Sequence, residues 1–190
     1  MRVWLASQST RRAEMLRQIF PDLTCQGIDS VDETSLAVNV SGQVLEICQK
    51  KASAVPNNVE FDLVIVSDTL LQDPDVDSLA MGKANDAIEA AAMLHRLSGR
   101  RHRVWSATGI LHQGNWEFHL NQAIVEFDDI SDEDLVELVL NNSWVGKAGS
   151  YDLAGDMGEF ASLVEGDEAT VLGIASDAMT RLVELSDYET

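Results

Sequence analysis

The sequence is poor in cysteine and has no long apolar runs. Its two cysteines, Cys25 and Cys48, are far apart and form no CxxC pair, so we interpret both as ordinary buried thiols of a reducing compartment. No apolar run approaches the roughly 20 residues that cross a bilayer, and the N-terminus lacks the sections of a signal peptide. We therefore expect a soluble, intracellular protein with no membrane partner.

Positive charge is scarce as well. The chain has 13 Lys and Arg residues against 32 Asp and Glu residues, a formal net charge of -19. The electric field of so negative a chain repels DNA and anionic lipids, so no nucleic-acid partner is expected. The short basic run at 100–103 is explained as the start of a strand next to a turn. We interpret the acidity as a solvating surface.

Strand and helix patterns alternate along the chain, which predicts an α/β or α+β fold around a mixed sheet, in a single domain over residues 1–190. Strands are predicted at 2–7, 62–67, 103–111, 115–127 and 159–164. Helices are predicted at 9–19, 41–55, 85–99, 130–140 and 174–185. The strands at 103–111 and 115–127 flank a Gln-Gly-Asn turn and are expected to form a hairpin.

Two arginines stand at an unfavourable place in the stretch LASQSTRRAEML, residues 5–16. Ser9 is a good N-cap, so Arg11 and Arg12 fall in the first turn of the helix. A cation there loses about 0.3 to 1 kcal/mol against the helix dipole. Because free backbone N–H groups and arginine forks both suit phosphate oxygens, an anion at this place would turn the cost into a binding site.

Three lysines are further candidates for binding such an anion. Lys51 lies on the predicted second helix, while Lys83 and Lys147 lie in glycine-containing loops. Each of them has the simpler explanation of an exposed, solubilising residue, and that alternative stays open. The arrangement favours an enzyme or a binder for a small phosphorylated anion.

A carboxylate and a hydroxyl, Asp68 and Thr69, directly follow the apolar strand at 62–67. The carboxyl end of a strand is where open α/β sheets bind ligands, and an Asp there can hold a divalent cation or accept a proton from water. A turn-capping role for Asp68 is the alternative. Glu33, in the pair Asp32-Glu33, is a second candidate carboxylate. The histidines have no metal-ligand spacing, and no Walker motif or serine elbow is present.

Several short blocks resemble those of one family, the Maf-type nucleoside triphosphate pyrophosphatases. They are LASQSTRR at 5–12, DE at 32–33, KA at 51–52, SDT at 67–69, GK at 82–83, MLHRLSGRRHRV at 93–104, KAGSYDLAG at 147–155, VEGD at 164–167 and VLGIA at 171–175. The blocks occur in family order from residue 5 to about residue 175.

The resemblance implies a fold, a reaction and a site. The fold would be an elongated α/β structure of the Maf and inosine triphosphatase kind, with a central mixed sheet flanked by helices and a cleft between two lobes. The enzyme would be a cytoplasmic homodimer that uses Mg²⁺ or Mn²⁺ to hydrolyse a nucleoside triphosphate, dTTP, UTP or a modified nucleotide, to the monophosphate and pyrophosphate. Asp68 and Glu33 would serve catalysis and the metal. The substrate would be bound by Ser7, Ser9, Arg11, Arg12, Lys51, Thr69 and Lys83.

Two departures from the family pattern leave a second hypothesis open. Ala154 stands where the family has a glutamine that serves base selection, and the segment between Thr69 and Gly82 is longer than usual. That segment adds three aspartates at 73, 75 and 77, which we interpret as a solvated turn, with an extra metal site as the alternative. The second hypothesis is a catalytically weakened nucleotide binder that regulates cell division.

Overall fold

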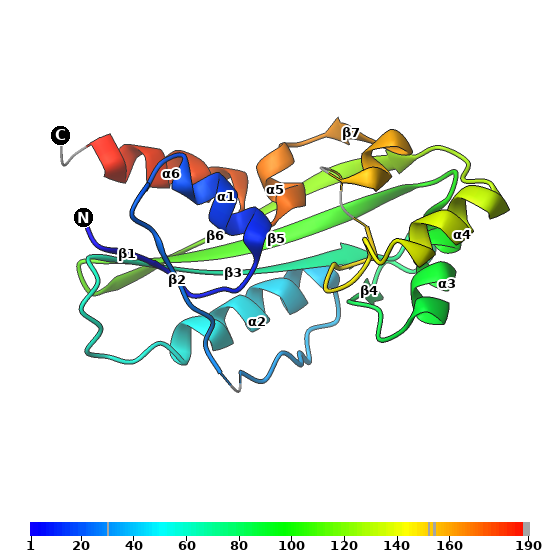
Figure 1. Ribbon diagram of the computed structural model, residues 1–190. Helices are drawn as coiled ribbons and strands as arrows, with labels where there is room; N and C mark the ends of the chain where they lie inside the picture. The colour runs from blue at the N-terminus through cyan, green and yellow to red at the C-terminus, as the bar shows by residue number, and fades with distance from the viewer. Residues whose placement is uncertain (30, 152, 154, 188–190) are drawn as a thin grey trace.

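The protein is elongated around two long paired strands, as the computed structural model shows (Figure 1). The structure describes residues 1–29, 31–151, 153 and 155–187. Its seven-stranded sheet has the order β2-β1-β3-β5-β6-β7, with β4 paired to β3. Parallel pairs join β1 to β2 and to β3, and the remaining pairs are antiparallel, so the prediction of a mixed sheet is confirmed.

The bounds of the elements agree with most of the predicted ranges. The strands are β1 (Val3–Leu5), β2 (Thr24–Cys25), β3 (Leu63–Gln72), β4 (Ala80–Met81), β5 (Arg101–His112), β6 (Asn115–Phe127) and β7 (Ala161–Glu165). The helices are α1 (Thr10–Arg17), α2 (Val40–Ser53), α3 (Ala87–Leu97), α4 (Asp132–Leu140), the 3-10 helix η1 (Asp156–Glu159), α5 (Glu168–Leu172) and α6 (Ser176–Asp187). No described helix is both long and apolar enough to cross a membrane.

Both faces of the sheet are covered at the β1 end. Helices α1, α5 and α6 lie on one face and α2 on the other (Figure 1). Within β3, Leu63 and Ile65 belong to the core under α1 and α6, whereas Val64 and Val66 belong to the core against α2. Burial on both faces explains why this part of β3 is an uninterrupted apolar run.

A separate core fills the other end of the molecule. Leu94 and Leu97 of α3 pack there with Phe127 and Leu138. Helices α3 and α4 lie side by side at this end (Figure 1). The sequence pattern located these helices well because each begins at a side-chain cap: Asp86 accepts from the amide of Glu89, and Ser131 from that of Asp134.

Strand β3 continues past its predicted end at residue 67. It pairs with β5 over its whole length, from Leu63 opposite His112 to Gln72 opposite Arg103. On its other edge, pairing with β1 stops at Ile65 and pairing with β4 starts at Leu71. Among the described strands, none borders β3 between these two residues on that edge. We call this stretch of β3, residues 66–70, the open edge.

Candidate functional site

Side chains alternate across the open edge. Ser67 and Thr69 point to the face of α1 and α5, and Asp68 points to the face of α2. The contacts show this directly, because Ser67 Oγ donates to the carbonyl of Gly173 at 2.7 Å, whereas Lys51 Nζ of α2 donates to Asp68 Oδ1 at 2.6 Å. Predicted site residues therefore reach the open edge from both faces of the sheet.

On the α2 face, one ammonium joins two carboxylates. Lys51 Nζ lies 2.6 Å from Asp68 Oδ1 and 3.0 Å from Glu33 Oε1. The side chains of Lys51 and Asp68 are 14% and 11% exposed, while that of Glu33 is 55% exposed. The predicted residues Glu33, Lys51 and Asp68 thus form one cluster, open to solvent on the Glu33 side.

Helix α2 positions both the lysine and the Glu33 loop. Lys51 lies in the last turn of α2, where the helix dipole favours a cation. Its neighbour Lys50 donates to Asp32 Oδ2 at 3.0 Å and to the carbonyl of Thr34 at 2.8 Å. Hydrogen bonds from Thr34, with a smaller contribution from Lys50, lower the pKa of Asp32 to about 2. The loop that carries Glu33 is thereby fastened to α2 on both sides of the residue.

Electrostatics keep Glu33 ionised. Burial by itself would raise the pKa of Glu33, but the hydrogen bond from Lys51 and the charges of Lys51, Lys83 and Arg12 outweigh it, and the pKa lies below its ordinary value. Lys83 and Arg12 therefore act on the same region of the molecule as the cluster. A chain of net charge -19 has a local concentration of cations here.

On the opposite face, Arg12 reaches the open edge from the first turn of α1. Ser9 caps this helix, as predicted. The guanidinium donates to the carbonyl of Gly173 at 2.8 Å, to Thr69 Oγ1 at 2.9 Å and to the carbonyl of Ser67 at 3.2 Å. A further contact joins it to Ser7 Oγ at 3.4 Å. Burial lowers the pKa of Arg12, although the charge of Asp68 opposes this.

These contacts explain why Arg12 stands at an unfavourable place in its helix: the guanidinium is held by hydrogen bonds to groups distant in sequence. Four of the five guanidinium N–H groups have partners within the protein, and one Nη2 hydrogen has no partner among the described residues. Arg11 stands beside it, and its like charge also lowers the pKa of Arg12. The role predicted for both arginines in phosphate binding stays a prediction.

Lys83 comes to the region from the other end of the molecule. Its side chain is exposed, and its backbone forms an isolated antiparallel bridge with Ala148. The amide of Gly149 donates to the carbonyl of Gly82 at 2.8 Å. The loop at 147–151 is thus paired to the segment that carries Lys83, which brings two of the family-like blocks together.

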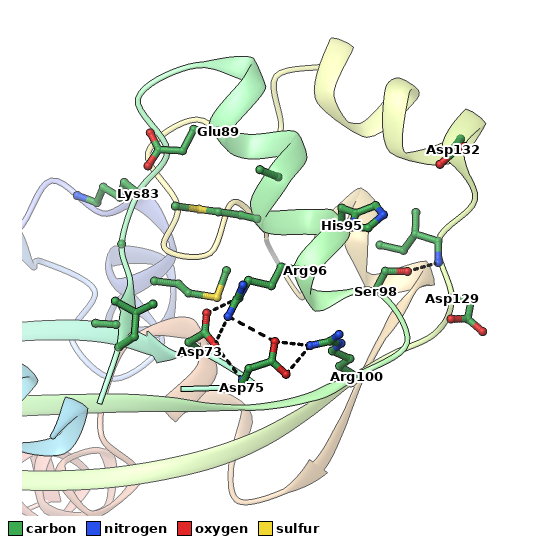
Figure 2. A pocket seen from close by; sticks show the side chains of 17 residues that line it. Asp73, Asp75, Lys83, Glu89, His95, Arg96, Ser98, Arg100, Asp129 and Asp132 are labelled. Atoms are coloured by element: carbon green, nitrogen blue, oxygen red, sulfur yellow. Dashed lines mark hydrogen bonds and ion pairs between the residues drawn. The ribbon is translucent and has the colours of Figure 1, made fainter. Parts of the chain in front are cut away.

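A cleft of about 940 Å³ opens next to Lys83 (Figure 2). It lies between β4, α3 and the segment that leads into α4, and Lys83 is its only lining residue from the predicted substrate set. The cleft therefore contains Lys83 but none of the cluster residues Glu33, Lys51 and Asp68. We place the candidate active site at the open edge because the paired carboxylates and the buried cations meet there.

The expectation of a solvated turn at Asp73, Asp75 and Asp77 holds for the exposed Asp75 and Asp77 but is wrong for Asp73. The side chain of Asp73 is 2% exposed and accepts from both Nε and Nη2 of Arg96, while Asp75 accepts from Arg100 at 2.6 Å (Figure 2). Asp77 accepts from the side chain of Gln72 at 2.7 Å. Arginines of the α3 region, distant in sequence, fix this segment through Asp73 and Asp75, and no local pattern revealed that pairing.

The interpretation of the cysteines needs one correction. Cys48 is buried, and burial raises the pKa of its thiol to about 12. Cys25 is partly exposed instead, at the end of the two-residue strand β2 near the sheet edge, and Arg17 lies 3.7 Å from its sulfur. The edge position of β2 was not foreseen, since a strand of two residues has no periodicity.

Comparison with known proteins places the chain in a family. The family model described as "Maf-like protein" matches residues 2–185. A dTTP/UTP pyrophosphatase of Pyrococcus abyssi is 33% identical over 95% of this chain and 94% of that protein. One of Pyrococcus horikoshii is 30% identical over 97% of both. The chain belongs to the family of Maf-like proteins. The solved structure of the Staphylococcus aureus Ham1 protein is 17% identical, with a TM-score of 0.46 over 68% of this chain and 73% of that chain.

One predicted determinant of base preference cannot be placed. Ala154, which replaces the family glutamine, lies outside the described residues. Thr69 of β3, predicted to bind the substrate, is half-buried and accepts the hydrogen bond from Arg12.

Proposed function

We propose that the protein hydrolyses a nucleoside triphosphate to the monophosphate and pyrophosphate, with dTTP and UTP as its preferred substrates. The observation that carries the proposal is the convergence of Asp68 and Glu33 on Lys51 Nζ at an edge of the sheet that no described strand covers. Membership of the Maf-like family and the activity named for the relatives support it.

The reaction assigns a role to each group. Asp68 takes the proton of a water molecule as the water oxygen bonds to the α-phosphorus; the bond to the bridging oxygen breaks, and pyrophosphate leaves with the electron pair. Lys51, Lys83 and Arg11 bind the triphosphate oxygens, joined by the remaining Nη2 hydrogen of Arg12. Ser7 and Ser9 lie at the same helix start, where backbone N–H groups suit phosphate. Catalysis in such reactions comes mainly from positioning and charge neutralisation.

The carboxylates also fit a divalent metal ion. Glu33 and Asp68 each direct one oxygen at the same ammonium, so the point between them already suits a cation. No group of three or more metal-ligating side chains occurs within the described ranges, but Mg²⁺ in nucleotide enzymes is held by one or two carboxylates together with substrate phosphates. We propose Glu33 and Asp68 as the protein's ligands; a bound Mg²⁺ or Mn²⁺ would neutralise charge on the phosphates.

Three further proposals remain. The family resemblance supports a cytoplasmic location and a homodimer, and the sequence pattern supports a single domain over residues 1–190. Continuity of the sheet from β2 to β7 supports the single domain.

Pyrophosphate release tests the activity directly. The purified protein is assayed with Mg²⁺ or Mn²⁺ and with dTTP, UTP, CTP, 7-methyl-GTP and ITP. Turnover of dTTP and UTP is expected, and Asp68→Asn should abolish it while the matched control Asp22→Asn, an exposed aspartate on the surface, retains it. Nucleotide binding without turnover of any triphosphate would favour the regulatory hypothesis instead. Equal rates for Asp68→Asn and the parent would refute the role of Asp68.

A further inference from the structure

Lys83 has little local structure to hold it in place. It follows the two-residue strand β4, and its side chain is exposed. The contacts that locate its backbone come from the loop at 147–151: the bridge between Lys83 and Ala148 and the hydrogen bond from Gly149 to the carbonyl of Gly82. The place of Lys83 therefore depends on the conformation of that loop.

The loop has a conformation that its sequence does not prefer. Gly149 and Ser150 follow each other with φ of 65° in both, and a non-glycine residue in the left-handed region is uncommon. Gly149 also passes so close to β3 that an added Cβ would lie 2.2 Å from Leu71 Cδ2. Such a conformation persists only where tertiary contacts fix it.

An anchor lies at the end of the loop. Tyr151 is 3% exposed, and its hydroxyl is 2.9 Å from Nε2 of His102 on β5. Its ring packs edge-on against the rings of His102 and Phe127, with centroids 5.4 and 5.0 Å away and interplanar angles of 85°. The hydroxyl contact and the two ring contacts together fix both ends of the tyrosine side chain.

A buried histidine at this position lowers the stability of the fold. His102 is 3% exposed, and its Nδ1 has no hydrogen-bond partner among the described residues. Burial lowers its pKa to about 4, so the imidazole is neutral near pH 7. An apolar ring would pack here without an unpaired polar atom. The contact with Tyr151 is what an apolar ring could not supply.

We propose that His102 and Tyr151 are positioning residues for the triphosphate: their hydrogen bond fixes the loop at 147–151, and the loop sets the place of Lys83. The inference rests on the proposed function, in which Lys83 binds phosphate oxygens. The proposal gives the imidazole of His102 and the hydroxyl of Tyr151, both buried in a core, a role in binding the substrate without touching it.

The test is a double-mutant cycle on KM. Tyr151→Phe keeps the ring and removes the hydroxyl, so the fold is retained; KM for dTTP should rise roughly fivefold, the effect of one neutral hydrogen bond. In a Lys83→Ala background, Tyr151→Phe should cause no further rise in KM. His102→Phe should behave like Tyr151→Phe, and His102→Gln, which can still bond to the hydroxyl, should restore much of the parent KM. Thr170→Val, at a buried hydroxyl that has no partner among the described residues, is the control.

Two outcomes would overturn the inference. One is an unchanged KM in Tyr151→Phe; the other is a rise of KM by the same factor with and without Lys83, which would mean general loosening of the fold. Failure of the proposed function looks different, because the parent itself would then neither hydrolyse dTTP nor bind its α,β-methylene analogue. Measuring that analogue's binding in parallel separates the two cases.

Discussion

The guanidinium of Arg12 in α1 donates to the carbonyl of Gly173, at 2.8 Å, across a sequence separation of 161 residues. Gly173 ends α5 with a φ of 115°, and an added Cβ would lie 2.7 Å from Arg12 Nε. The C-terminal part of the chain thereby determines where a residue of the N-terminal motif lies. The contact requires glycine at 173 for two reasons: glycine tolerates the positive φ, and it has no Cβ that would meet Arg12.

Gly173→Ala is therefore expected to lower stability by about 1 to 3 kcal/mol, and to lower kcat/KM for dTTP by roughly tenfold because Arg12 moves away from the open edge. Urea unfolding and steady-state kinetics measure the two effects. The matched control is Gly114→Ala at the hairpin tip, where φ is 78° and nothing lies within 4 Å of the added Cβ. If both variants reduced kcat/KM equally, the contact with Arg12 would have no part in the effect.

Lys51→Met should remove the ammonium between Asp68 and Glu33 while keeping the length of the side chain. We expect kcat/KM to fall on the order of 100-fold, because two carboxylates are left without their cation at a site that receives a polyanion. Lys50→Met is the control on the same helix turn; it affects the Glu33 loop only, and we expect a loss below tenfold. Similar losses in the two variants would contradict a special role for Lys51.

Asp73→Asn should destabilise the fold by about 2 kcal/mol, since it weakens the charge-assisted hydrogen bonds that the nearly fully buried carboxylate accepts from Arg96. Burial would raise the pKa of Asp73, but the hydrogen bonds from Arg96 and from the amides of Asp75 and Val76, together with the charge of Arg96, outweigh it and hold the pKa below its ordinary value. The contribution of Asp73 to stability is thus fully present above the pKa of an unfolded aspartate, and it is lost as the pH falls through the lower pKa of the folded state. Asp75→Asn, whose side chain is 51% exposed, should cost less than about 1 kcal/mol. Urea unfolding at pH 7 compares them, and equal losses would show that burial of Asp73 is unimportant.

The stability of the protein should fall between about pH 6.5 and pH 4 because of His102. The folded pKa is about 4, against about 6.5 for an unfolded histidine. The unfolded state therefore binds more protons in this range, and stability rises with pH through it, by about 3 kcal/mol in all. Urea unfolding at pH 7, 6 and 5 should show a shallower dependence for His102→Gln than for the parent. His95→Gln, at an exposed histidine of α3, should keep the parent's dependence.

Much of the fold was predictable because its elements carry local signals. Caps at Ser9, Asp86 and Ser131 start helices where the sequence places them, and the turn at Gln113 and Gly114 joins β5 and β6. The strands β2 and β4, with two residues each, were missed because so short a segment has no periodicity. Helix α5, with five residues, was missed for the same reason.

The sequence by itself determined which residue types stand in the motif blocks and that Asp68 and Thr69 come at the carboxyl end of the apolar run at 62–67. Only the tertiary structure decided that β3 pairs with β1 no further than Ile65 and with β4 only from Leu71, which leaves the edge of β3 between them open. It also decided that Arg12 is held by Gly173 and that Tyr151 is held by His102. The physical reason is that strand ends and long-range hydrogen bonds depend on which segments pack together, and no local stretch of sequence contains that information.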